Sequence, residues 1–389
     1  MTELRLLTAG ESHGKNLVAI LEGIPANLKI SLEEIVLQLQ RRRIGKGRGS
    51  RMHIERDMIE VVSGVRHGRT TGNPIGIIIG NAEWEKWKEI MSPFADACNN
   101  EEAILYPRPG HADLAGICKY NQTDIRNISE RASARETAAR VAAGALCRIF
   151  LKEFSIEIVS HIISIGNVSI GDRSVTFQQA RAIKAFSPLR CVDQKVKAKM
   201  VKIITASAKK GDTLGGVFEI IVKGVSPGLG SHIQWDLRLD GALAGAIMAL
   251  HGIKGVEIGR GFESARLQGS QVHDAIYYNK KRGYYRGTNN SGGIEGGMSN
   301  GEEIRIRVAM KPIPTVRHSL PSVNIATGKK GTATFQRSDV CAVNPASVIG
   351  EHIAAIILTQ FFLRKFGGDS MQETKYNYNG YLKQYQYQP

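Results

Sequence analysis

The chain has 389 residues, enough for one large domain or two ordinary ones, and its 52 Lys and Arg against 36 Asp and Glu give a formal net charge of +16. That charge favours a polyanionic partner: nucleic acid, an acidic membrane surface or a highly charged small substrate. The five cysteines are odd in number and form no CxxC, which excludes a disulfide framework and favours reduced cytoplasmic thiols. We expect a cytoplasmic protein, because no apolar signal region opens the chain and no apolar run approaches the ~20 residues of a membrane span.

Apolar runs bounded by turn-forming residues predict the secondary structure. Short runs predict β-strands at residues 4–8, 17–21, 75–79, 217–222 and 304–308. Longer periodic or small-residue runs predict helices at residues 31–43, 133–150, 236–250 and 346–366. The first two helices begin with Ser and Glu in capping-box spacing, at Ser31 with Glu34 and at Ser133 with Glu136. Gly252 is a candidate C-cap for the third helix, and the fourth stops at two glycines.

The organisation of the chain indicates an α+β fold in one large domain. Small residues in the helices, such as those at 142–145, allow close approach and predict helices buried between sheets. No linker interrupts residues 1–367, which we interpret as a single domain. Residues 283–301 contain seven glycines and are predicted to form a mobile loop. Residues 368–389 are rich in Tyr, Gln and Asn without apolar periodicity, and we predict a disordered tail there.

A basic segment follows the first predicted helix. Its cations are Arg41, Arg42, Arg43, Lys46, Arg48, Arg51 and Arg56, with Glu55 as the one carboxylate. The apolar stripe of the helix, continued by three and four residues, reaches Arg42 and Arg43, so at least one arginine points where the core-facing residues point. The glycines at 45, 47 and 49 let backbone and guanidinium groups converge on one anion. Because no aromatic platform lies among these charges, an anion pocket is favoured over RNA binding.

The string Gly10-Glu11-Ser12-His13-Gly14 fits the nucleophile-elbow pattern G-x-S-x-G of serine hydrolases. An elbow needs a strand, a sharp turn and then a helix, whereas residues 17–21 predict a second strand here. A nucleophile at residue 12 also leaves no room for the strands that normally precede it. We reject the hydrolase interpretation and keep His13 as a candidate acid or base.

Other strings carry groups suited to binding anions and moving protons. His111 lies in a Pro-Gly turn beside Arg108 and Asp113, where a surface histidine is the plain alternative. Arg131 and Arg135 flank a predicted helix N-terminus, where backbone N–H groups attract anions. Residues 311–315 are predicted to form a Lys-Pro-Ile-Pro-Thr turn stiffened by its prolines, which is either a phosphate-binding turn or a connection between strands. Arg337-Ser338-Asp339 is either part of a site or a surface salt bridge.

Together these strings resemble the chorismate synthase family from about Leu4 to Phe366. The matching strings are GESHG at 10–14, RRR…GRG at 41–49, SGVRHG at 63–68, TTG at 70–72, RPGHAD at 108–113, R-x-SAR-E-T at 131–137, KGVEIG at 254–259, SGGIEGG at 291–297, KPIPT at 311–315 and RSDVCAV at 337–343. Each string alone is of moderate specificity, but so many in one order are hard to reach by chance.

The resemblance implies an activity, a cofactor and an assembly. It implies conversion of 5-enolpyruvylshikimate 3-phosphate to chorismate and phosphate, the last common step of aromatic amino acid biosynthesis in the shikimate pathway. This carbon–oxygen lyase reaction is a 1,4-anti elimination that uses reduced FMN without net redox change, with NADPH as a candidate reductant of the flavin. The resemblance also implies a homotetramer and a β-α-β sandwich in which helices pack between antiparallel sheets. Binding of nucleic acid or membrane is not expected.

The same resemblance assigns roles residue by residue. It implies catalytic roles for His13, as the acid that assists phosphate departure, for His111 at the flavin proton, and for Asp339 in deprotonation at flavin N5. The implied substrate-binding residues are Ser12, Arg42, Arg48, Arg51, Arg108, Arg135 and Arg337. The implied FMN-binding residues are Arg131, Ala132, Ser133, His251, Gly252, Gly296, Lys311, Pro312, Ile313, Pro314, Thr315 and Arg337, and Arg42 and Arg48 match NADP positions. No metal site is expected.

The chain departs from the family pattern in three places. His251-Gly252 replaces a pair that more often ends in Ala, so backbone contacts there are better supported than side-chain roles. The usual proline after Val343 comes one place late, as Asn344-Pro345, which predicts a shifted start for the helix that follows. The Tyr-rich tail has no counterpart in the pattern. The less favoured alternatives are a basic RNA-binding or scaffold protein and a GxSxG hydrolase.

Overall fold

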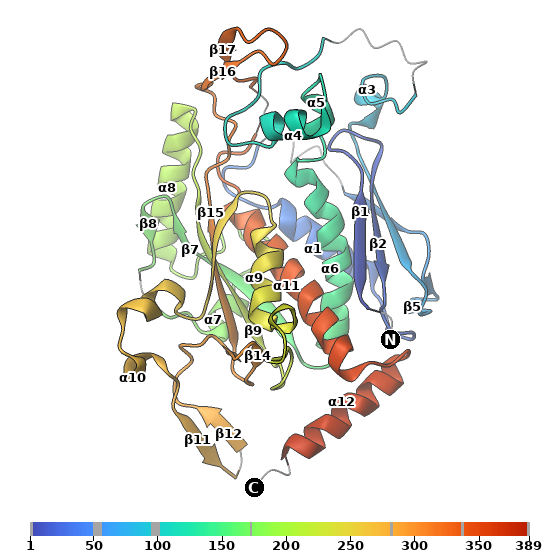
Figure 1. Ribbon diagram of the computed structural model, residues 1–389, viewed down its shortest axis with the longest axis vertical. Helices are drawn as coiled ribbons and strands as arrows, with labels where there is room; N and C mark the ends of the chain where they lie inside the picture. Colours follow the sequence, from blue (N-terminus) through green and yellow to red (C-terminus); the bar gives the residue numbers. More distant parts are fainter. Residues whose placement is uncertain are drawn as a thin grey trace.

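The computed structural model describes residues 3–49, 57–94, 102–171, 173–280, 283–335 and 338–386. The chain combines helices with antiparallel sheets, as expected for the α+β class (Figure 1). One sheet has the order β1-β2-β6-β3, from β1 (Arg5–Ala9), β2 (Asn16–Glu22), β6 (Ile75–Gly80) and β3 (Met58–Val61). The other has the order β10-β15-β9-β7-β8, from β10 (Ile253–Ile258), β15 (Ile304–Met310), β9 (Gly216–Lys223), β7 (Glu157–Ile165) and β8 (Val168–Ser169).

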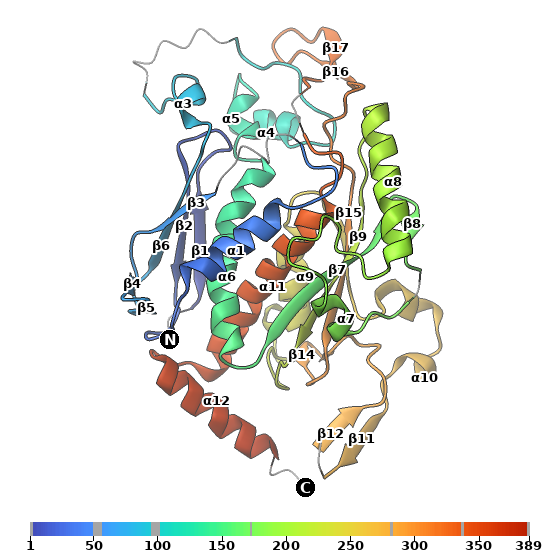
Figure 2. The ribbon, with the colours of Figure 1, turned by 180° about the vertical axis from the view of Figure 1, so that it is seen from behind.

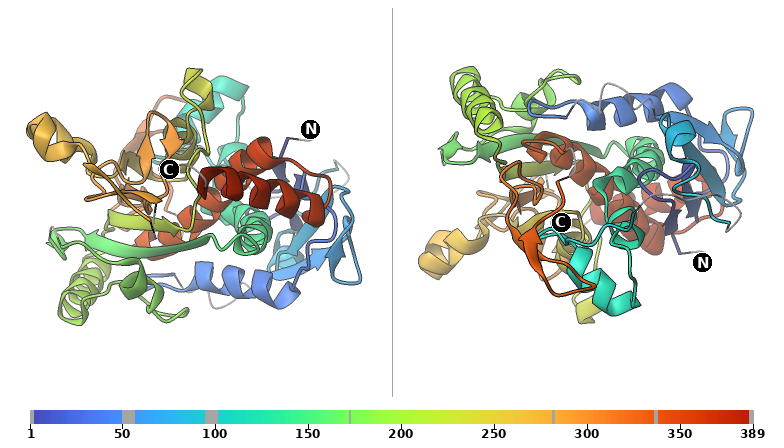
Figure 3. Two further views of the ribbon diagram at one scale, coloured as in Figure 1. Left: turned by 90° about the horizontal axis from the view of Figure 1, so that it is seen from below. Right: turned by 90° about the horizontal axis from the view of Figure 1, so that it is seen from above.

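Two long helices lie between these sheets (Figures 1 and 3). Helix α6 (Thr137–Lys152) contacts β2 and β6, and helix α11 (Val343–Phe366) contacts β7 and β9. The helices pack closely because Gly144 on α6 has no side chain: a Cβ there would lie 2.6 Å from the Cβ of His352 on α11. Strand β2 buries alternate residues toward this layer, as Leu17 and Leu21 show, while Ile20 between them is exposed.

Shorter helices complete the molecule. Figure 2, seen from behind, shows α1 crossing in front of α6 and α11, and α8 beside the second sheet. The helices not yet given are α1 (Leu32–Arg43), α3 (Trp84–Trp87), α4 (Asp113–Tyr120), α5 (Arg126–Ser129), α7 (Phe177–Arg181), α8 (Gln194–Lys210), α9 (Leu239–Met248), α10 (Gly269–Val272) and α12 (Met371–Gln386). The 3-10 helices are η1 (Ala134–Glu136), η2 (Trp235–Leu237) and η3 (Gly261–Arg266), and the paired short strands are β4 (Val65–Arg66), β5 (Arg69–Thr70), β11 (Ile276–Asn279), β12 (Gly283–Arg286), β13 (Ile294–Glu295), β14 (Met298–Ser299), β16 (Pro321–Val323) and β17 (Lys330–Thr332).

The predicted strands and the four predicted helices are confirmed, with shifted ends. The Glu34 backbone N–H donates to the Ser31 hydroxyl at 3.2 Å, which caps α1 as predicted. At the second predicted helix, η1 comes before α6. Gly252 is not the C-cap of α9, because the helix ends at Met248 with Ala249 as its C-cap, and Gly252 lies in the turn beyond it. Helix α11 begins at Val343, before its predicted start, and accommodates Pro345 in its first turn, where no intrahelical N–H is required.

Two predictions about the glycine-rich and C-terminal segments are wrong. Residues 283–301 are not one loop, because β12 pairs with β11 and β13 pairs with β14. The tail contains helix α12, whose Tyr378 ring contacts the rings of Phe154, Phe362 and Phe366. The Tyr381 hydroxyl also donates to the carbonyl of Pro227 at 2.9 Å. Aromatic packing and this hydrogen bond therefore hold a segment whose composition is polar.

Helix α11 also corrects the expectation that no apolar run approaches a membrane span. By length and composition alone it is apolar enough to cross a membrane, but most of its apolar window is buried inside the protein. The buried core helix of a soluble protein meets the same two criteria. In this chain the apolar character of α11 is explained by its position between the sheets.

Candidate active site

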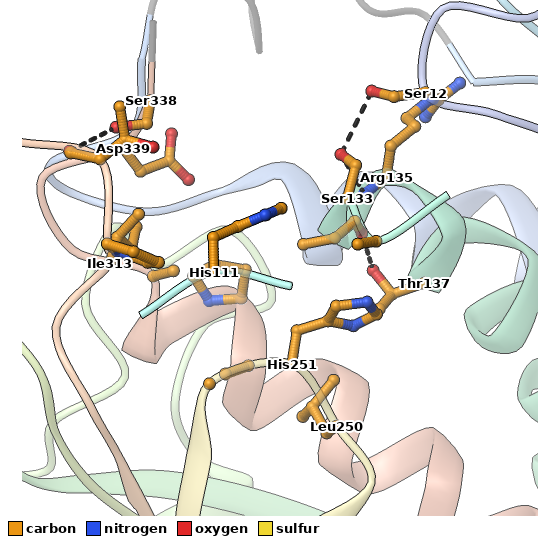
Figure 4. Close-up of a pocket in the computed structure, with 18 of the residues that line it drawn as sticks. Ser12, His111, Ser133, Arg135, Thr137, Leu250, His251, Ile313, Ser338 and Asp339 are labelled. Atoms are coloured by element: carbon orange, nitrogen blue, oxygen red, sulfur yellow. Dashed lines mark hydrogen bonds between the residues drawn. The ribbon is translucent and has the colours of Figure 1, made fainter. Parts of the chain in front are cut away.

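A cavity of about 550 Å³ lies where loops from distant parts of the chain meet the starts of α6 and α11. Figure 4 shows the side chains of His111 and His251 between Ser133 and Thr137 on one side and Ile313 and Asp339 on the other. The lining residues come from the loop at 12–13, the segment 42–49, the turn at 108–112, residues 129–137, residues 250–252 and 310–315, and residues 338–349. The strings that contain His13, His111 and Asp339 thus meet at one cavity.

His13 reaches the cavity from the loop between β1 and β2. Gly10 allows this loop to turn at φ +103°, where an added Cβ would lie 2.3 Å from the carbonyl oxygen of Asn16. His13 Nδ1 lies 2.8 Å from Oε1 of Glu130, and the His13 backbone N–H donates to Oε2 at 2.7 Å. The Ser12 hydroxyl accepts a hydrogen bond from the Ser133 hydroxyl at 3.2 Å. A strand follows the loop, so the elbow geometry of a serine hydrolase is not present.

His111 is held by a buried carboxylate and an arginine. Its Nδ1 lies 2.5 Å from Oδ1 of Asp113, and Arg108 donates from Nε and Nη2 to the two oxygens of the same carboxylate, at 2.7 and 2.9 Å. Burial by itself raises the pKa of Asp113, but the hydrogen bonds from His111 and Arg108 outweigh it and hold that pKa well below its usual range. The ionised carboxylate has no hydrogen to donate. Nδ1 of His111 is therefore the donor of this hydrogen bond, and the Asp113 carboxylate accepts it.

Arg42 and Arg135 share one buried carboxylate behind the cavity wall. Arg135 pairs with Asp57, and Arg42 Nη1 lies 3.8 Å from the same carboxylate. Arg42 Nε also donates to the Thr137 hydroxyl at 3.0 Å, at the first residue of α6. Both arginines line the cavity while Asp57 does not. The burial of Arg41 and Arg42 confirms that this end of α1 points inward, and it argues against a nucleic-acid surface at these residues.

Arg48 and Asp339 face each other at the other side of the cavity. Their side chains form an ion pair, and the Gly49 backbone N–H donates to Oδ1 of Asp339 at 2.7 Å. The predicted substrate arginine and the predicted base therefore contact each other in this structure. Ser338, next in the chain, donates from its hydroxyl to the Thr315 carbonyl at 3.0 Å and ties this segment to the turn at 311–315.

The turn at 311–315 and the residues before β10 form a third wall. Lys311 Nζ donates to the carbonyl of Gly110 at 2.5 Å, which joins this turn to the turn that carries His111. Removal from water lowers the pKa of Lys311. Burial likewise lowers the pKa of His251, and Glu136, whose carboxylate lies 3.7 Å from His251 Nδ1, offsets part of that effect.

Most of the predicted site residues line the cavity: Ser12, His13, Arg42, Arg48, Arg108, His111, Ala132, Ser133, Arg135, His251, Gly252, Lys311, Pro312, Ile313, Pro314, Thr315 and Asp339. Arg51 and Arg337 lie outside the described residues. The remaining two, Arg131 and Gly296, do not line the cavity.

The positions of Arg131 and Gly296 have structural reasons. The Arg131 guanidinium donates to the carbonyls of Gly10 and Thr8, both at 2.9 Å, so it supports the loop that carries His13. Gly296 lies in the β13–β14 turn, and its neighbour Gly297 accepts a hydrogen bond from Leu239, the first residue of α9. His251 follows the opposite end of that ten-residue helix, a separation of about 15 Å along the helix.

Sequence reasoning missed residues that position the predicted ones. Glu130 and Thr137 line the cavity, and Asp57 pairs with two of its arginines. The sequence gives one signal for Glu130, which directly precedes the R-x-SAR string. Asp57 directly follows the basic segment that ends at Arg56. Among the described residues, no group of three or more His, Cys, Asp or Glu could hold a metal ion.

Comparison with known proteins gives a consistent result over nearly the whole chain. The profile of a family described as chorismate synthase matches residues 4–363. A chorismate synthase of Alkaliphilus metalliredigens is 50% identical over 377 residues, which cover 97% of this chain and 99% of that protein. A chorismate synthase of Moorella thermoacetica is 50% identical over 384 residues, which cover 98% and 100%. A crystal structure of chorismate synthase has a TM-score of 0.80 and 44% identity, with 99% of each chain covered.

Proposed function

The chain belongs to the chorismate synthase family, and we propose that it catalyses that family's reaction. The reaction converts 5-enolpyruvylshikimate 3-phosphate to chorismate and phosphate by a 1,4-anti elimination, so the enzyme is a carbon–oxygen lyase. The observation that carries the proposal is the meeting of three strings, at residues 10–14, 108–113 and 338–339, around one cavity. These strings are about a hundred or more residues apart in sequence, and each brings a group that can hold or move a proton.

The cations of the cavity suit this substrate. It carries two carboxylates and a phosphate, whose charge is about −1.5 to −2 at neutral pH. Arg42, Arg48, Arg108 and Arg135 line the cavity together with Lys311. Arginine presents several N–H donors in a fixed plane, which allows two-point contact with carboxylate or phosphate. We propose that these four arginines, with Ser12 and, outside the described residues, Arg51 and Arg337, bind the substrate anions.

The cavity also fits FMN. Its volume of about 550 Å³ lies in the range of small-molecule and cofactor sites. The apolar side chains of Leu250, Met310 and Ile313 suit a flat ring system, while Lys311 and the buried Thr315 hydroxyl suit a phosphate. We propose that Ala132, Ser133, His251, Gly252 and residues 311–315 hold FMN. Reduced flavin, when bound, would supply electron density to the substrate while phosphate leaves and take it back afterwards.

We propose roles in proton transfer for three side chains of the cavity. We propose that His13 gives a proton to the departing phosphate, that His111 holds a proton toward the flavin and that Asp339 accepts the proton released at flavin N5. Asp339 is paired with Arg48 in this structure. A substrate carboxylate or phosphate that binds Arg48 would compete for the guanidinium and leave the Asp339 carboxylate with the Gly49 N–H. Substrate binding would therefore prepare Asp339 to accept a proton.

Three further properties follow from the family and are part of the proposal. We propose a homotetramer in the cytoplasm, built from subunits in which helices pack between antiparallel sheets. The contacts of α6 with one sheet and α11 with the other support this layered arrangement. Gly296 and Arg131 lie off the cavity, so a flavin contact by Gly296 requires that a second subunit bring its β13–β14 hairpin to this cavity. NADPH is the candidate reductant, with Arg42 and Arg48 as its contacts.

An anaerobic assay tests the proposed function. Purified protein is mixed with 5-enolpyruvylshikimate 3-phosphate, with and without chemically reduced FMN, and phosphate and chorismate are followed together. We expect equal amounts of both products, and only with reduced flavin. Tight FMN binding without turnover would contradict the proposed activity while leaving a flavoprotein. Binding of generic RNA that weakens with salt and ignores flavin would favour the rival nucleic-acid function.

A further inference from the structure

We propose that Glu130 is a positioning residue that fixes the proton of His13 on Nδ1, so that Nε2 is the atom that exchanges a proton with the leaving phosphate, and that Trp87 holds the ring in this orientation. This inference rests on the proposed function, in which His13 is the acid. During the elimination the carbon–oxygen bond breaks and its electron pair goes to the phosphate oxygen. That oxygen takes the proton from Nε2, and His13 is left neutral with its remaining proton on Nδ1.

The contacts of Glu130 carry the first part of the inference. Its carboxylate lies 2.8 and 3.0 Å from His13 Nδ1 and accepts the His13 backbone N–H at 2.7 Å. Its backbone carbonyl accepts the N–H of Ser12 at 3.0 Å, so Glu130 fixes both the loop and the ring. The carboxylate is 7% exposed and His13 is 18% exposed. A buried acceptor that faces one ring nitrogen sets the tautomer of a neutral imidazole and leaves the other nitrogen available.

The stack with Trp87 carries the second part. The rings of His13 and Trp87 have centroids 3.9 Å apart and planes inclined by 27°. Asn81 holds the segment that carries Trp87 against the histidine loop, because its side-chain amide donates to the carbonyls of Ser12 and Gly14 at 3.0 and 3.1 Å. The indole therefore covers one face of the imidazole while Glu130 fixes its edge. Rotation of the ring is restricted by both contacts.

A comparison with His111 and its carboxylate shows why Glu130 is distinctive. Asp113 also faces Nδ1 of its histidine, but Arg108 contacts both oxygens of that carboxylate. Among the residues that the structure describes, Glu130 forms an ion pair with His13 alone. Its negative charge is therefore directed at His13, whereas the charge of Asp113 is shared with Arg108.

Two variants test the role of the carboxylate. Glu130→Ala removes it, and Glu130→Gln removes its negative charge and replaces one of its two acceptor oxygens by an NH₂ group, which only donates hydrogen bonds. We expect kcat to fall roughly 10-fold or more in both, with KM and FMN affinity within about threefold of wild type. Formate, a small carboxylate, should restore part of the kcat of Glu130→Ala but not of wild type. Glu85→Gln, an exposed carboxylate of α3, is the matched control and should leave turnover unchanged.

A fluorescence measurement tests the geometry without turnover. In a Trp84→Phe/Trp235→Phe background Trp87 is the single tryptophan, and the stacked imidazole should quench its emission. We expect the emission to rise in Glu130→Ala, where the ring is no longer fixed, and to stay unchanged in Glu85→Gln. Unchanged kcat and unchanged emission in Glu130→Ala would overturn the inference. A parallel loss of FMN binding and thermal stability, without formate rescue, would also overturn it by showing a general structural role.

The two measurements separate this inference from the proposed function. If the wild-type protein forms no chorismate, the proposed function fails, and the emission of the single-tryptophan protein still decides whether Glu130 fixes the ring. If the wild-type protein turns over and Glu130→Ala matches it, the function stands and the positioning role is wrong. Emission that rises together with a fall in kcat supports both.

Discussion

Arg41 and Arg42 are neighbours on α1, yet their side chains enter two different regions. In one region the arginines surround a buried carboxylate, and in the other they face a cavity. Arg41 donates from both terminal nitrogens to the two oxygens of Glu351, at 2.9 and 3.0 Å. Glu351 is fully buried in α11 and also accepts from Arg148 and Arg190. Arg42 instead contacts Thr137 and lines the cavity. One region is a closed cluster in the helical core, and the other is open to a ligand.

The two regions differ in the position of the carboxylates relative to the arginines they pair with. In the closed cluster three guanidinium groups surround one carboxylate, and the Ser160 hydroxyl completes its contacts at 2.7 Å. In the cavity, Asp57 and Asp113 pair with their arginines from behind the lining, so the arginines remain at the wall. Buried carboxylates thus hold arginines in both regions, but only the cavity presents them to an anion. Damage to the closed cluster should reduce stability, and damage to the cavity should reduce binding or turnover.

The largest expected effect is on the closed cluster. Glu351→Gln leaves the buried Arg41 and Arg190 and the half-buried Arg148 without their carboxylate, and we expect the free energy of unfolding to fall by roughly 3–5 kcal/mol. The exposed pair of Glu34 with Lys152 offers a matched control on α1, and Glu34→Gln should cost under about 1 kcal/mol. Denaturant unfolding followed by circular dichroism measures both. Equal midpoints for the two variants would contradict the assignment of Glu351 to the stability of the core.

The next effect is on turnover. His13→Ala should lower kcat by roughly 10² or more, because the departing phosphate loses its proton donor. Its unfolding midpoint and FMN affinity should stay near those of wild type, in contrast to Glu351→Gln. Anaerobic turnover and a flavin titration, made on the same preparation, test this expectation. Turnover near the wild-type rate would remove His13 from the role of acid.

A smaller effect is expected on affinity. Arg48→Ala should weaken substrate binding by about 10-fold and FMN binding less, because a charge-assisted contact to a substrate anion is lost. Asp339→Asn, which changes the partner of Arg48, should leave substrate affinity nearly intact but slow the deprotonation step. Ligand titrations and single-turnover kinetics distinguish the two variants. Equal losses of substrate and flavin affinity in Arg48→Ala would indicate a general structural role for the arginine.

The sequence predicted the open region better than the closed one. The strings that line the cavity combine Gly, His and Arg in patterns that core packing does not explain, so they stand out. Glu351 and Arg190 give no such signal, because each becomes meaningful only when α1, α6 and α11 come together. The burial of Arg42 was predictable from helical periodicity, but the same periodicity did not identify Arg41. Long-range pairing in three dimensions decides which arginines are structural.

The fold shows the same limit. Strand and helix positions follow local apolar patterns, and the structure confirms them with shifted ends. Helix α12 was missed because its contacts are made by tyrosines such as Tyr378, which a hydropathy reading counts as polar. The Glu130 contact with His13 was missed because the two residues are far apart in sequence and meet only when the segment before α6 reaches the loop between β1 and β2. Composition cannot show such contacts.

The smallest expected effect is a pH dependence that separates the two regions. Burial raises the pKa of Glu351, but Arg41, Arg190 and Arg148 together hold it well below its unfolded range. A depressed folded pKa contributes stability above the unfolded pKa near 4.3, and that contribution is lost as the pH falls, because only the unfolded state takes up the proton. Between pH 5 and 4 this one group should cost roughly 0.5 kcal/mol. Denaturant unfolding gives the pH dependence of the unfolding free energy for wild type and for Glu351→Gln. Their difference isolates the contribution of Glu351 from that of Asp113, which lies behind the cavity lining. Identical slopes would mean that the pKa of Glu351 is the same in the folded and unfolded chain, and the cluster would then not be the charged counterpart of the open site.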